Sequence, residues 1–179
     1  MKSLKIATFL TAAMLGGSLV SGKAAVSIST RPTQNMTCSG GVCTPTAKKA
    51  VLNVNDLATM LASGDATVQS GSLAKDIEIG AALSWTSTHR MTLDSYHSIV
   101  FNKGVVIAGT GALTITTNHG GQNGDSRFFG KGHVEFWDLS SSLIINGQSY
   151  SLEKKINALA RDIKNDSTGN YALAKSLNE

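Results

Sequence analysis

The feature that constrains this chain most is a set of apolar pairs between Ile77 and Asn118, in which each member recurs at the position whose number is higher by 22. The first set is Ile77 and Ile79, Leu83 and Trp85, and Met91 and Leu93, and the second is Ile99 and Phe101, Val105 and Ile107, and Leu113 and Ile115. The spacing of two within each pair is typical of a strand with one buried face. Three short strands per repeat, stacked with residue i beside residue i+22, predict a parallel β-helix with a narrow apolar core.

We therefore predict an all-β fold, a short parallel β-helix of about three coils, over residues 66–150. The period breaks at the Gly-rich stretch from His119 to Gly132. Val134 and Phe136 look like Ile99 and Phe101 displaced by 35 instead of 22, which indicates an insertion of about 13 residues. The third coil should therefore keep its register less strictly.

Helices are predicted at both ends of this unit. Residues 51–65 place Leu57, Met60 and Leu61 on one helical face, with Asn55 as a possible N-cap. Such a helix would cover the open first coil, whose exposed edge invites aggregation. Residues 151–179 form a C-terminal helical segment, which could cap the last coil. Its predicted N-cap is Ser151, and its apolar stripe is Leu152, Ile156, Leu159 and Ile163.

The N-terminus has the pattern of a signal peptide over residues 1–25. Two lysines precede an apolar stretch from Ile6 to Val20, and small residues follow, so cleavage is predicted after Gly22, Ala24 or Ala25. The alternative is an uncleaved N-terminal anchor. No second apolar stretch reaches membrane length, so we expect no stable membrane span in the mature chain.

Residues 26–50 read as a flexible, polar arm that contains the only two cysteines, Cys38 and Cys43. The Gly40-Gly41 pair between them permits a tight turn, and in an exported protein such a pair predicts a disulfide. A redox pair or half of a metal site is the alternative. The spacing of the cysteines and the lack of a neighbouring histidine disfavour both.

The charge of the chain argues against a nucleic-acid partner. The formal net charge is +4, but three of the 16 basic residues lie in or beside the leader, and the remaining 13 nearly balance 12 acidic residues. No basic run with interleaved aromatic residues occurs, so the sequence lacks the electrostatic footprint of a nucleic-acid-binding protein.

The candidate chemistry is sparse, and we predict no catalytic residues, cofactor or metal. Gly120 to Asp125 is similar to a calcium-binding nonapeptide, but its third Gly and its Asp are adjacent, which favours a plain turn. The four histidines, His89, His97, His119 and His133, fall near corners without ligand spacing. Asp94, Asp76 and Glu78 stack on non-acidic residues. Asp125, Glu135 and Asp138, with Arg127 and Lys131, are the only acidic cluster on which an enzyme could draw.

Several segments resemble one known family. They are the stretch from Cys38 to Lys48, Val51 to Leu57, Leu83 to Trp85 with Met91 to Asp94, Leu139 to Gly147, and Tyr171 to Lys175. They are similar to the N-terminal region of filamentous-haemagglutinin-like large secreted proteins of proteobacteria, which often precedes GLUG-type repeats. The resemblance implies a right-handed β-helix, export and an adhesin-like surface role. The chain departs from it by lacking the Asn-Pro-Asn motifs of two-partner secretion.

These observations predict an exported β-helix protein, secreted or on the outer surface of a Gram-negative bacterium, with an adhesin-like or structural binding role. Its partner would be a surface glycan, a protein or further β-helix repeats of a larger protein. The alternatives are a secreted carbohydrate-active enzyme and a truncated N-terminal fragment without a function of its own. The predicted contact loop comprises Gly120, Gly121, Gly124, Asp125, Arg127, Phe128 and Phe129. Packing of the two Phe residues on the shaft is the competing interpretation.

Overall fold

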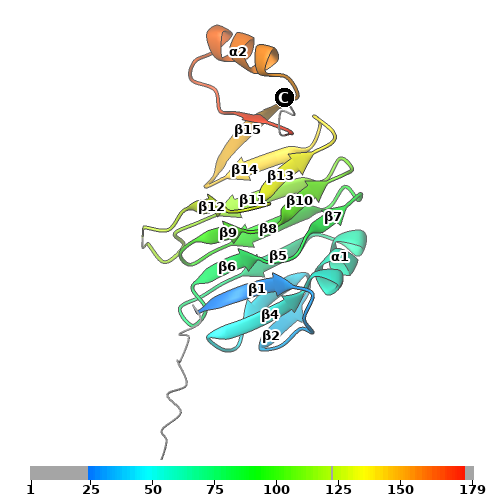
Figure 1. The fold of residues 1–179 in the computed structure, drawn as a ribbon, viewed down its shortest axis with the longest axis vertical. Helices are drawn as coiled ribbons and strands as arrows, with labels where there is room; N and C mark the ends of the chain where they lie inside the picture. The colour runs from blue at the N-terminus through cyan, green and yellow to red at the C-terminus, as the bar shows by residue number, and fades with distance from the viewer. Residues whose placement is uncertain (1–23, 122, 176–179) are drawn as a thin grey trace, which may run out of the picture.

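The computed structural model describes residues 24–121 and 123–175 and is a parallel β-helix of about four turns, one more than predicted. Three sheets run along the helix, as Figure 1 shows. Sheet A has the strand order β12-β9-β6-β1-β4, sheet C has β13-β10-β7, and sheet B has β16-β15-β14-β11-β8-β5-β3-β2. We call the end with β2, β4 and α1 the lower end, and the end with β12, β13 and β15 the upper end.

The regular middle consists of two complete coils. The strands of the first are β6 (Asp76–Ile79), β7 (Leu83–Trp85) and β8 (Arg90–Asp94), and those of the second are β9 (Ile99–Phe101), β10 (Gly104–Ile107) and β11 (Ala112–Thr116). Ile77 pairs with Ile99, Leu83 with Val105, and Met91 with Leu113. The predicted stacking of residue i on residue i+22 is therefore confirmed in all three sheets.

The next coil follows a different register from the predicted one. Its strands are β12 (Ser126–Phe128), β13 (His133–Phe136) and β14 (Ser142–Ile145). Phe128 stacks above Phe101, whereas Phe136 stacks above Ile107. The predicted match of Phe136 to Phe101 was wrong because Phe128 itself occupies the position in sheet A and Phe136 belongs to sheet C. Leu143 and Ile145 continue the pattern above Leu113 and Ile115, as predicted.

The predicted flexible arm, residues 26–50, is part of the solenoid, and this corrects the sequence interpretation. It forms strands β1 (Ala25–Ser29), β2 (Met36–Ser39), β3 (Val42–Pro45) and β4 (Lys49–Asn53). Strand β1 lies between β4 and β6 and is parallel to both, although the chain passes from β4 to β6 without it. The alternation of Val26 and Ile28 with small polar residues buries both apolar side chains completely. The N-terminal strand therefore fills a gap between two successive coils.

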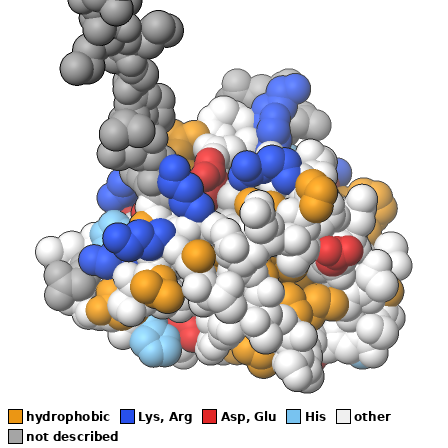
Figure 2. Space-filling view, turned by 90° about the horizontal axis from the view of Figure 1, so that it is seen from below, with side chains coloured by type: hydrophobic (Ala, Val, Ile, Leu, Met, Phe, Trp, Pro, Cys, Tyr) orange, Lys and Arg blue, Asp and Glu red, His pale blue; other side chains and the backbone are white. Residues whose placement is uncertain are grey.

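The lower end is capped on all three faces. Helix α1 (Val54–Ser63) takes the position of a strand below β7 and buries Leu57 and Leu61. Asn53, rather than the predicted Asn55, is its N-cap, because the Asn53 side chain accepts a hydrogen bond from the Asn55 amide. The β2–β3 hairpin closes sheet B, and a bridge between Gln34 and Val51 covers the edge of β4. Figure 2 shows this end as largely polar, with its hydrophobic side chains scattered.

The C-terminal segment differs from the predicted helical cap. Strand β15 (Gln148–Glu153) folds back antiparallel on β14, so Ser151 and Leu152 lie in a strand and Ser151 is no N-cap. Strand β5 (Ala66–Gln69) and strand β16 (Tyr171–Leu173) complete sheet B. Helix α2 (Ile156–Asn165) stands above β15 and has no buried residue, so it does not cap the last coil (Figure 1). The reason is that β15 and β16 already occupy the end of sheet B.

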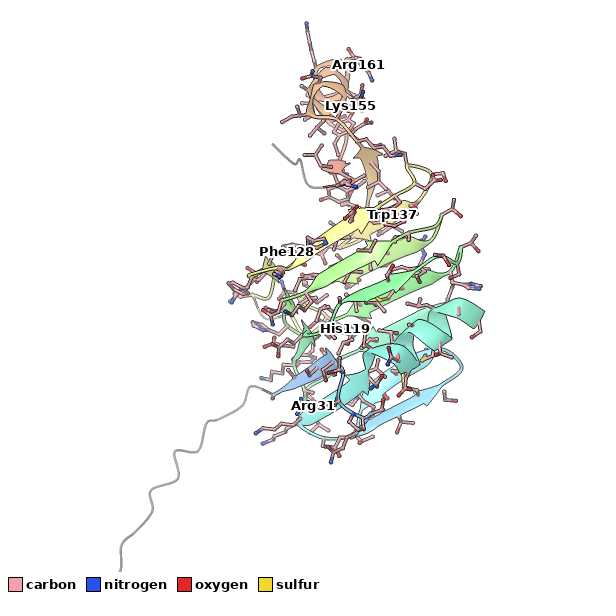
Figure 3. All side chains as sticks on the ribbon, turned by 45° about the vertical axis from the view of Figure 1, so that its right-hand side comes forward. Arg31, His119, Phe128, Trp137, Lys155 and Arg161 are labelled. Atoms are coloured by element: carbon pink, nitrogen blue, oxygen red, sulfur yellow. A yellow bond between two sulfur atoms is a disulfide. The ribbon has the colours of Figure 1, made fainter. Side chains whose placement is uncertain are left out.

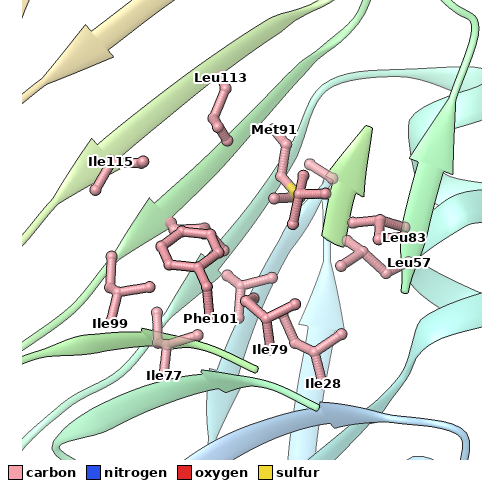
Figure 4. Close-up of a cluster of buried hydrophobic side chains, with 14 of the residues drawn as sticks. Ile28, Leu57, Ile77, Ile79, Leu83, Met91, Ile99, Phe101, Leu113 and Ile115 are labelled. Carbon is pink, nitrogen blue, oxygen red and sulfur yellow. The ribbon is translucent and has the colours of Figure 1, made fainter. Parts of the chain in front are cut away.

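The core is a single column of side chains that points inward from the three sheets (Figure 4). Along sheet A, Leu52, Ile28, Ile79, Phe101 and Phe128 stack in that order. Trp85 is 4% exposed beneath Ile107, which places its large ring in the core, as the sequence predicts. The indole N–H of Trp85 donates to the His89 carbonyl at 3.1 Å, so its polar atom is satisfied.

The position of β1 generates a prediction for stability. Replacing Ile28 with Ala would leave a cavity between Leu52 and Ile79, because neighbouring coils constrain one another on both sides. We expect Ile28→Ala to lower the free energy of unfolding by about 2–5 kcal/mol, measured by urea denaturation. Ser27→Ala, on the outward face of the same strand, should change it by less than about 0.5 kcal/mol. Equal stabilities for the two variants would show that β1 is not part of the cooperative core.

Candidate binding surface at the upper end

Large apolar side chains that remain exposed gather at the upper end. Among the described residues they are Val42, Leu73, Phe128, Phe129, Trp137, Leu139, Ile156 and Ile163. Six of these eight lie between Phe128 and Ile163, in the last coil, the corner after it and helix α2. Figure 3 shows Phe128 and Trp137 at opposite sides of the last coil, below Lys155 and Arg161. The apolar exposure therefore marks one end of the molecule rather than its sides.

The predicted contact loop is anchored by close backbone approaches. Asn118, in a left-handed conformation with φ 62°, clasps Gly124: its side chain donates to the Gly124 carbonyl at 2.6 Å and accepts from the Gly124 amide. A Cβ at Gly124 would lie 1.9 Å from the His97 carbonyl oxygen, and one at Gly120 would overlap the Tyr96 ring at 2.3 Å. Glycine is therefore required at both positions so that the loop can lie against the coil below.

Strand β12 continues the core stack into solvent. The Phe128 ring lies 4.7 Å from the Phe101 ring at an interplanar angle of 11°, and Phe128 nevertheless stays 50% exposed. Phe129, which follows it, is 55% exposed. Phe128 therefore packs on the shaft through one face, as the competing interpretation predicts, and leaves its other face open. The contact role of the loop stays a prediction. No described strand pairs with the outer edge of β12.

The charged residues of the loop are paired with each other. Arg127 Nε lies 2.6 Å from Asp125 Oδ1, and both side chains are about half exposed. Gly121 is in a left-handed turn conformation with φ 71° and has open space around it. The loop thus presents an ion pair and two aromatic rings rather than a cluster of free carboxylates.

A second group of residues surrounds Trp137, which is 58% exposed and follows β13. Glu135 Oε1 accepts a hydrogen bond from the Trp137 indole N–H at 3.0 Å and forms an ion pair with Lys175 Nζ at 3.2 Å. A hollow of about 240 Å³ lies here and is lined by Phe136, Trp137, Lys154 and Lys175. Sequence reasoning missed this group, since its members come from three separate segments and no local motif joins them.

Asp138 borders the same region. The hydroxyl and the amide of Ser140 donate to Asp138 Oδ1 at 2.7 Å and 2.8 Å. The Ser140 hydroxyl, the Ser140 amide and the nearby Lys154 hold the pKa of Asp138 below its ordinary value. Asp138 is therefore an ionised acceptor rather than a proton donor at neutral pH.

The acidic cluster that an enzyme could use is divided between two sheets. Asp125 precedes β12 in sheet A, whereas Glu135 lies in β13 of sheet C and Asp138 follows it. Asp125 pairs with Arg127, Glu135 with Lys175, and Asp138 with Ser140. Lys131 takes part in none of these pairs. Asp125 is therefore set apart from Glu135 and Asp138, and each of the three carboxylates has a polar or charged partner.

Three of the four histidines pair with aspartates of the coil below, which the sequence interpretation of solvent-exposed corners missed. His97 Nδ1 lies 2.6 Å from Asp76 Oδ1, His119 Nδ1 lies 3.0 Å from Asp94 Oδ1, and His89 Nδ1 lies 3.5 Å from Asp65 Oδ1. The sequence separation between the partners could have revealed these pairs. It is 21 residues for His97 and 25 for His119, which is close to the length of one coil. The Ser98 amide also donates to Asp76 Oδ1, so the pair fastens a corner between coils.

No metal-binding group of three or more His, Cys, Asp or Glu side chains occurs among residues 24–121 and 123–175. The stretch from Gly120 to Asp125 is occupied by the Asn118 clasp and the Asp125–Arg127 pair. A hollow of about 590 Å³ lies at the lower end beside the disulfide hairpin. Its ionisable side chains are only Asp65 and His89, which already pair with each other.

The disulfide is present between Cys38 and Cys43, with an S–S distance of 2.00 Å. The two cysteines face each other across the β2–β3 hairpin. Cys43 is buried, and its Sγ lies 3.8 Å from the Met60 sulfur of α1. The bond thus closes the hairpin that caps sheet B, and the Cys43–Met60 contact packs this hairpin against the helix that caps sheet C, far from the upper end.

No family model, curated protein or solved structure matches the chain. The resemblance to filamentous-haemagglutinin-like proteins therefore stays a prediction, and the class established here is that of the parallel β-helix. In the described part of the chain, no helix has both the length and the apolar character needed to cross a bilayer. The predicted leader lies outside the described residues, except for Ala24 and Ala25.

The loop anchor can be tested at Gly124. A side chain there cannot fit against the His97 carbonyl, so we expect Gly124→Ala to lift the loop from the coil below. Limited proteolysis should cut the variant between residues 119 and 132 at least about tenfold faster than the parent, because local opening exposes the backbone. Gly71→Ala is the control, since a Cβ at Gly71 meets no atom within 4 Å. Equal cleavage of both variants would contradict the clasp.

Proposed function

We propose that this chain is an exported β-helix protein with an adhesin-like role, and that it binds other surfaces through its upper end. The observation that carries the proposal is the contrast between the two ends. The lower end is closed by α1, the β2–β3 hairpin and the Gln34 bridge. Of the eight exposed large apolar side chains in the part of the chain that the structure describes, six gather at the other end. Exposed apolar groups concentrated in one region mark an interaction surface.

The build of the upper end supports contact rather than catalysis. Phe128 and Phe129 are half exposed on a loop that Asn118 and the two close-packed glycines hold in place. Rigid aromatic side chains bury a large area on binding at a small cost in conformational entropy, so they are favoured as anchors. The acidic side chains nearby are each occupied by a different partner, which favours binding over hydrolysis.

Export is supported by the cysteine pair and by the position of β1. A disulfide persists in an oxidising compartment, which agrees with the predicted signal peptide. The Ala24 carbonyl accepts hydrogen bonds from the Lys75 amide at 2.8 Å and the Asp76 amide at 3.4 Å. Of the three predicted cleavage positions, only the one after Gly22 leaves this contact intact. We therefore favour Gly22 as the last residue of the leader.

A second candidate role is structural. The edge of β12 is open, and Phe128 presents half of its ring where a further coil would stack. Parallel strands of another β-helix segment could continue sheet A there, because an unpaired edge is a template for strand addition. This role would make the chain one end of a longer fibre, and it uses the same upper end.

The adhesin-like role predicts that charges placed at the upper end abolish binding. We expect the secreted chain to be retained on whole Gram-negative cells. Phe129→Lys and Ile163→Lys should each reduce retention about tenfold in a co-sedimentation assay, because a charge opposes desolvation of the contact. The matched control is Leu73→Lys, which changes a side chain of similar exposure, 48%, away from the upper end. If all three variants bind like the parent, the upper end is not the contact surface.

A further inference from the structure

We infer that the hollow beside Trp137 is a binding subsite for one pyranose ring of a neutral glycan. This inference deepens the proposed adhesin-like role and rests on it. The hollow measures about 240 Å³ and is lined by Phe136, Trp137, Lys154 and Lys175. It therefore admits a single sugar ring rather than a long polymer segment, whose remaining units would extend into solvent.

The platform of the subsite is the indole ring of Trp137. Trp137 is the most exposed of the large apolar side chains at the upper end, at 58%. Its ring position is nevertheless fixed, because the indole N–H donates to Glu135 Oε1 at 3.0 Å. An aromatic face that is held in place and open to solvent suits the flat face of C–H groups on a pyranose, which gains dispersion contacts with it.

Polar groups that could bind sugar hydroxyls stand around this platform. Lys154 and Lys175 line the hollow and present ammonium donors. Glu135, whose side chain is 19% exposed, fixes Lys175 as well as Trp137, since Lys175 Nζ lies 3.2 Å from the same carboxylate oxygen. Asp138 adds an ionised acceptor beside Lys154. The subsite thus offers both donors and acceptors, as a ring with several hydroxyl groups requires.

The charge balance selects a neutral ligand. Lys154 and Lys175 line the hollow, Lys175 pairs with Glu135 Oε1 at 3.2 Å, and Asp138 follows Trp137 and feels the charge of Lys154. A sugar acid would be attracted by the lysines but repelled by Glu135 and Asp138. A cationic ligand would be attracted by the two carboxylates but repelled by the lysines. A neutral polyhydroxylated ring meets no such repulsion, because each hydroxyl both donates and accepts.

The backbone holds the three segments that supply these residues close together. Glu135, Phe136 and Trp137 come from β13 and the corner after it, Lys154 follows β15, and Lys175 follows β16. The amide of Phe136 donates to the Ala174 carbonyl at 2.7 Å, which brings Lys175 beside the corner. Ala174 is completely buried at this junction. The three segments are therefore held together by the backbone and not by the surface side chains alone.

The test is isothermal titration calorimetry of the secreted chain with a panel of tetrasaccharides. The neutral probes are cellotetraose, maltotetraose, mannotetraose and chitotetraose, and the charged comparator is tetragalacturonic acid. We expect at least one neutral probe to bind with a dissociation constant in the millimolar range or below, and the acidic probe to bind more weakly. Trp137→Ala should weaken this binding at least about tenfold, whereas Trp137→Phe should retain most of it.

Controls separate the subsite from general effects. Leu73→Ala removes another half-exposed apolar side chain, away from the upper end, and should leave sugar binding unchanged. Lys154→Met should weaken binding several-fold, whereas Lys103→Met, at an exposed corner between β9 and β10, should not. Circular dichroism of each variant shows whether it is folded. If Trp137→Ala does not fold, the loss of binding expected for Lys154→Met still tests the subsite.

Three results would overturn the inference: no binding of any neutral probe, unchanged binding by Trp137→Ala, or preference for the acidic probe. The proposed adhesin-like role fails separately. A chain that is retained on cells but binds no neutral tetrasaccharide overturns the subsite alone. A chain that binds a tetrasaccharide at Trp137 but is not retained on cells overturns the surface role alone.

Discussion

The whole structure depends on the in-register stacking of side chains between parallel coils. Along sheet A, Leu52, Ile28, Ile79, Phe101 and Phe128 lie one above another, and each is held by backbone pairing on both sides except at the ends. Because a coil buries its apolar face only against its neighbours, no single coil is stable alone. The first and last members of the stack therefore decide how the molecule ends, and the two ends use different solutions.

At the lower end the chain supplies its own covers. Helix α1 replaces a strand, the disulfide hairpin closes sheet B, and β1 returns from the N-terminus to fill the space between β4 and β6. At the upper end only part of the last coil is covered. Strands β15 and β16 extend sheet B, and the Ala174 carbonyl bonds to Phe136 of sheet C, but β12 has a free edge. The same requirement for burial thus produces a closed end and an end that is available for contact.

Sequence reasoning predicted what repeats and missed what does not. The apolar pairs of the middle coils have one spacing, so Ile77, Leu83 and Met91 could be matched to Ile99, Val105 and Leu113 without a structure. Strand β1 could not be placed in this way, because it stacks below β6, in a coil that the chain reaches only after α1. Phe136 was matched to Phe101 for a related reason. The loop before β12 is longer than the repeat allows, so Phe128 takes the place above Phe101 that the strict period would give to Asn123. Long-range pairing with an irregular offset leaves no periodic signal.

The candidate surface follows the same division. The loop with Phe128 and Phe129 was predictable because a Gly-rich interruption of a regular repeat stands out locally, and the two rings are large. The hollow beside Trp137 was not predictable, since Glu135, Lys154 and Lys175 become neighbours only after β14, β15 and β16 have folded back over the last coil. The residues that end the solenoid are therefore also the residues that shape its second surface feature. These segments do not have to follow the repeat, so their side chains can present polar and aromatic groups to solvent. The upper end of the β-helix therefore carries exposed groups that could bind a ligand.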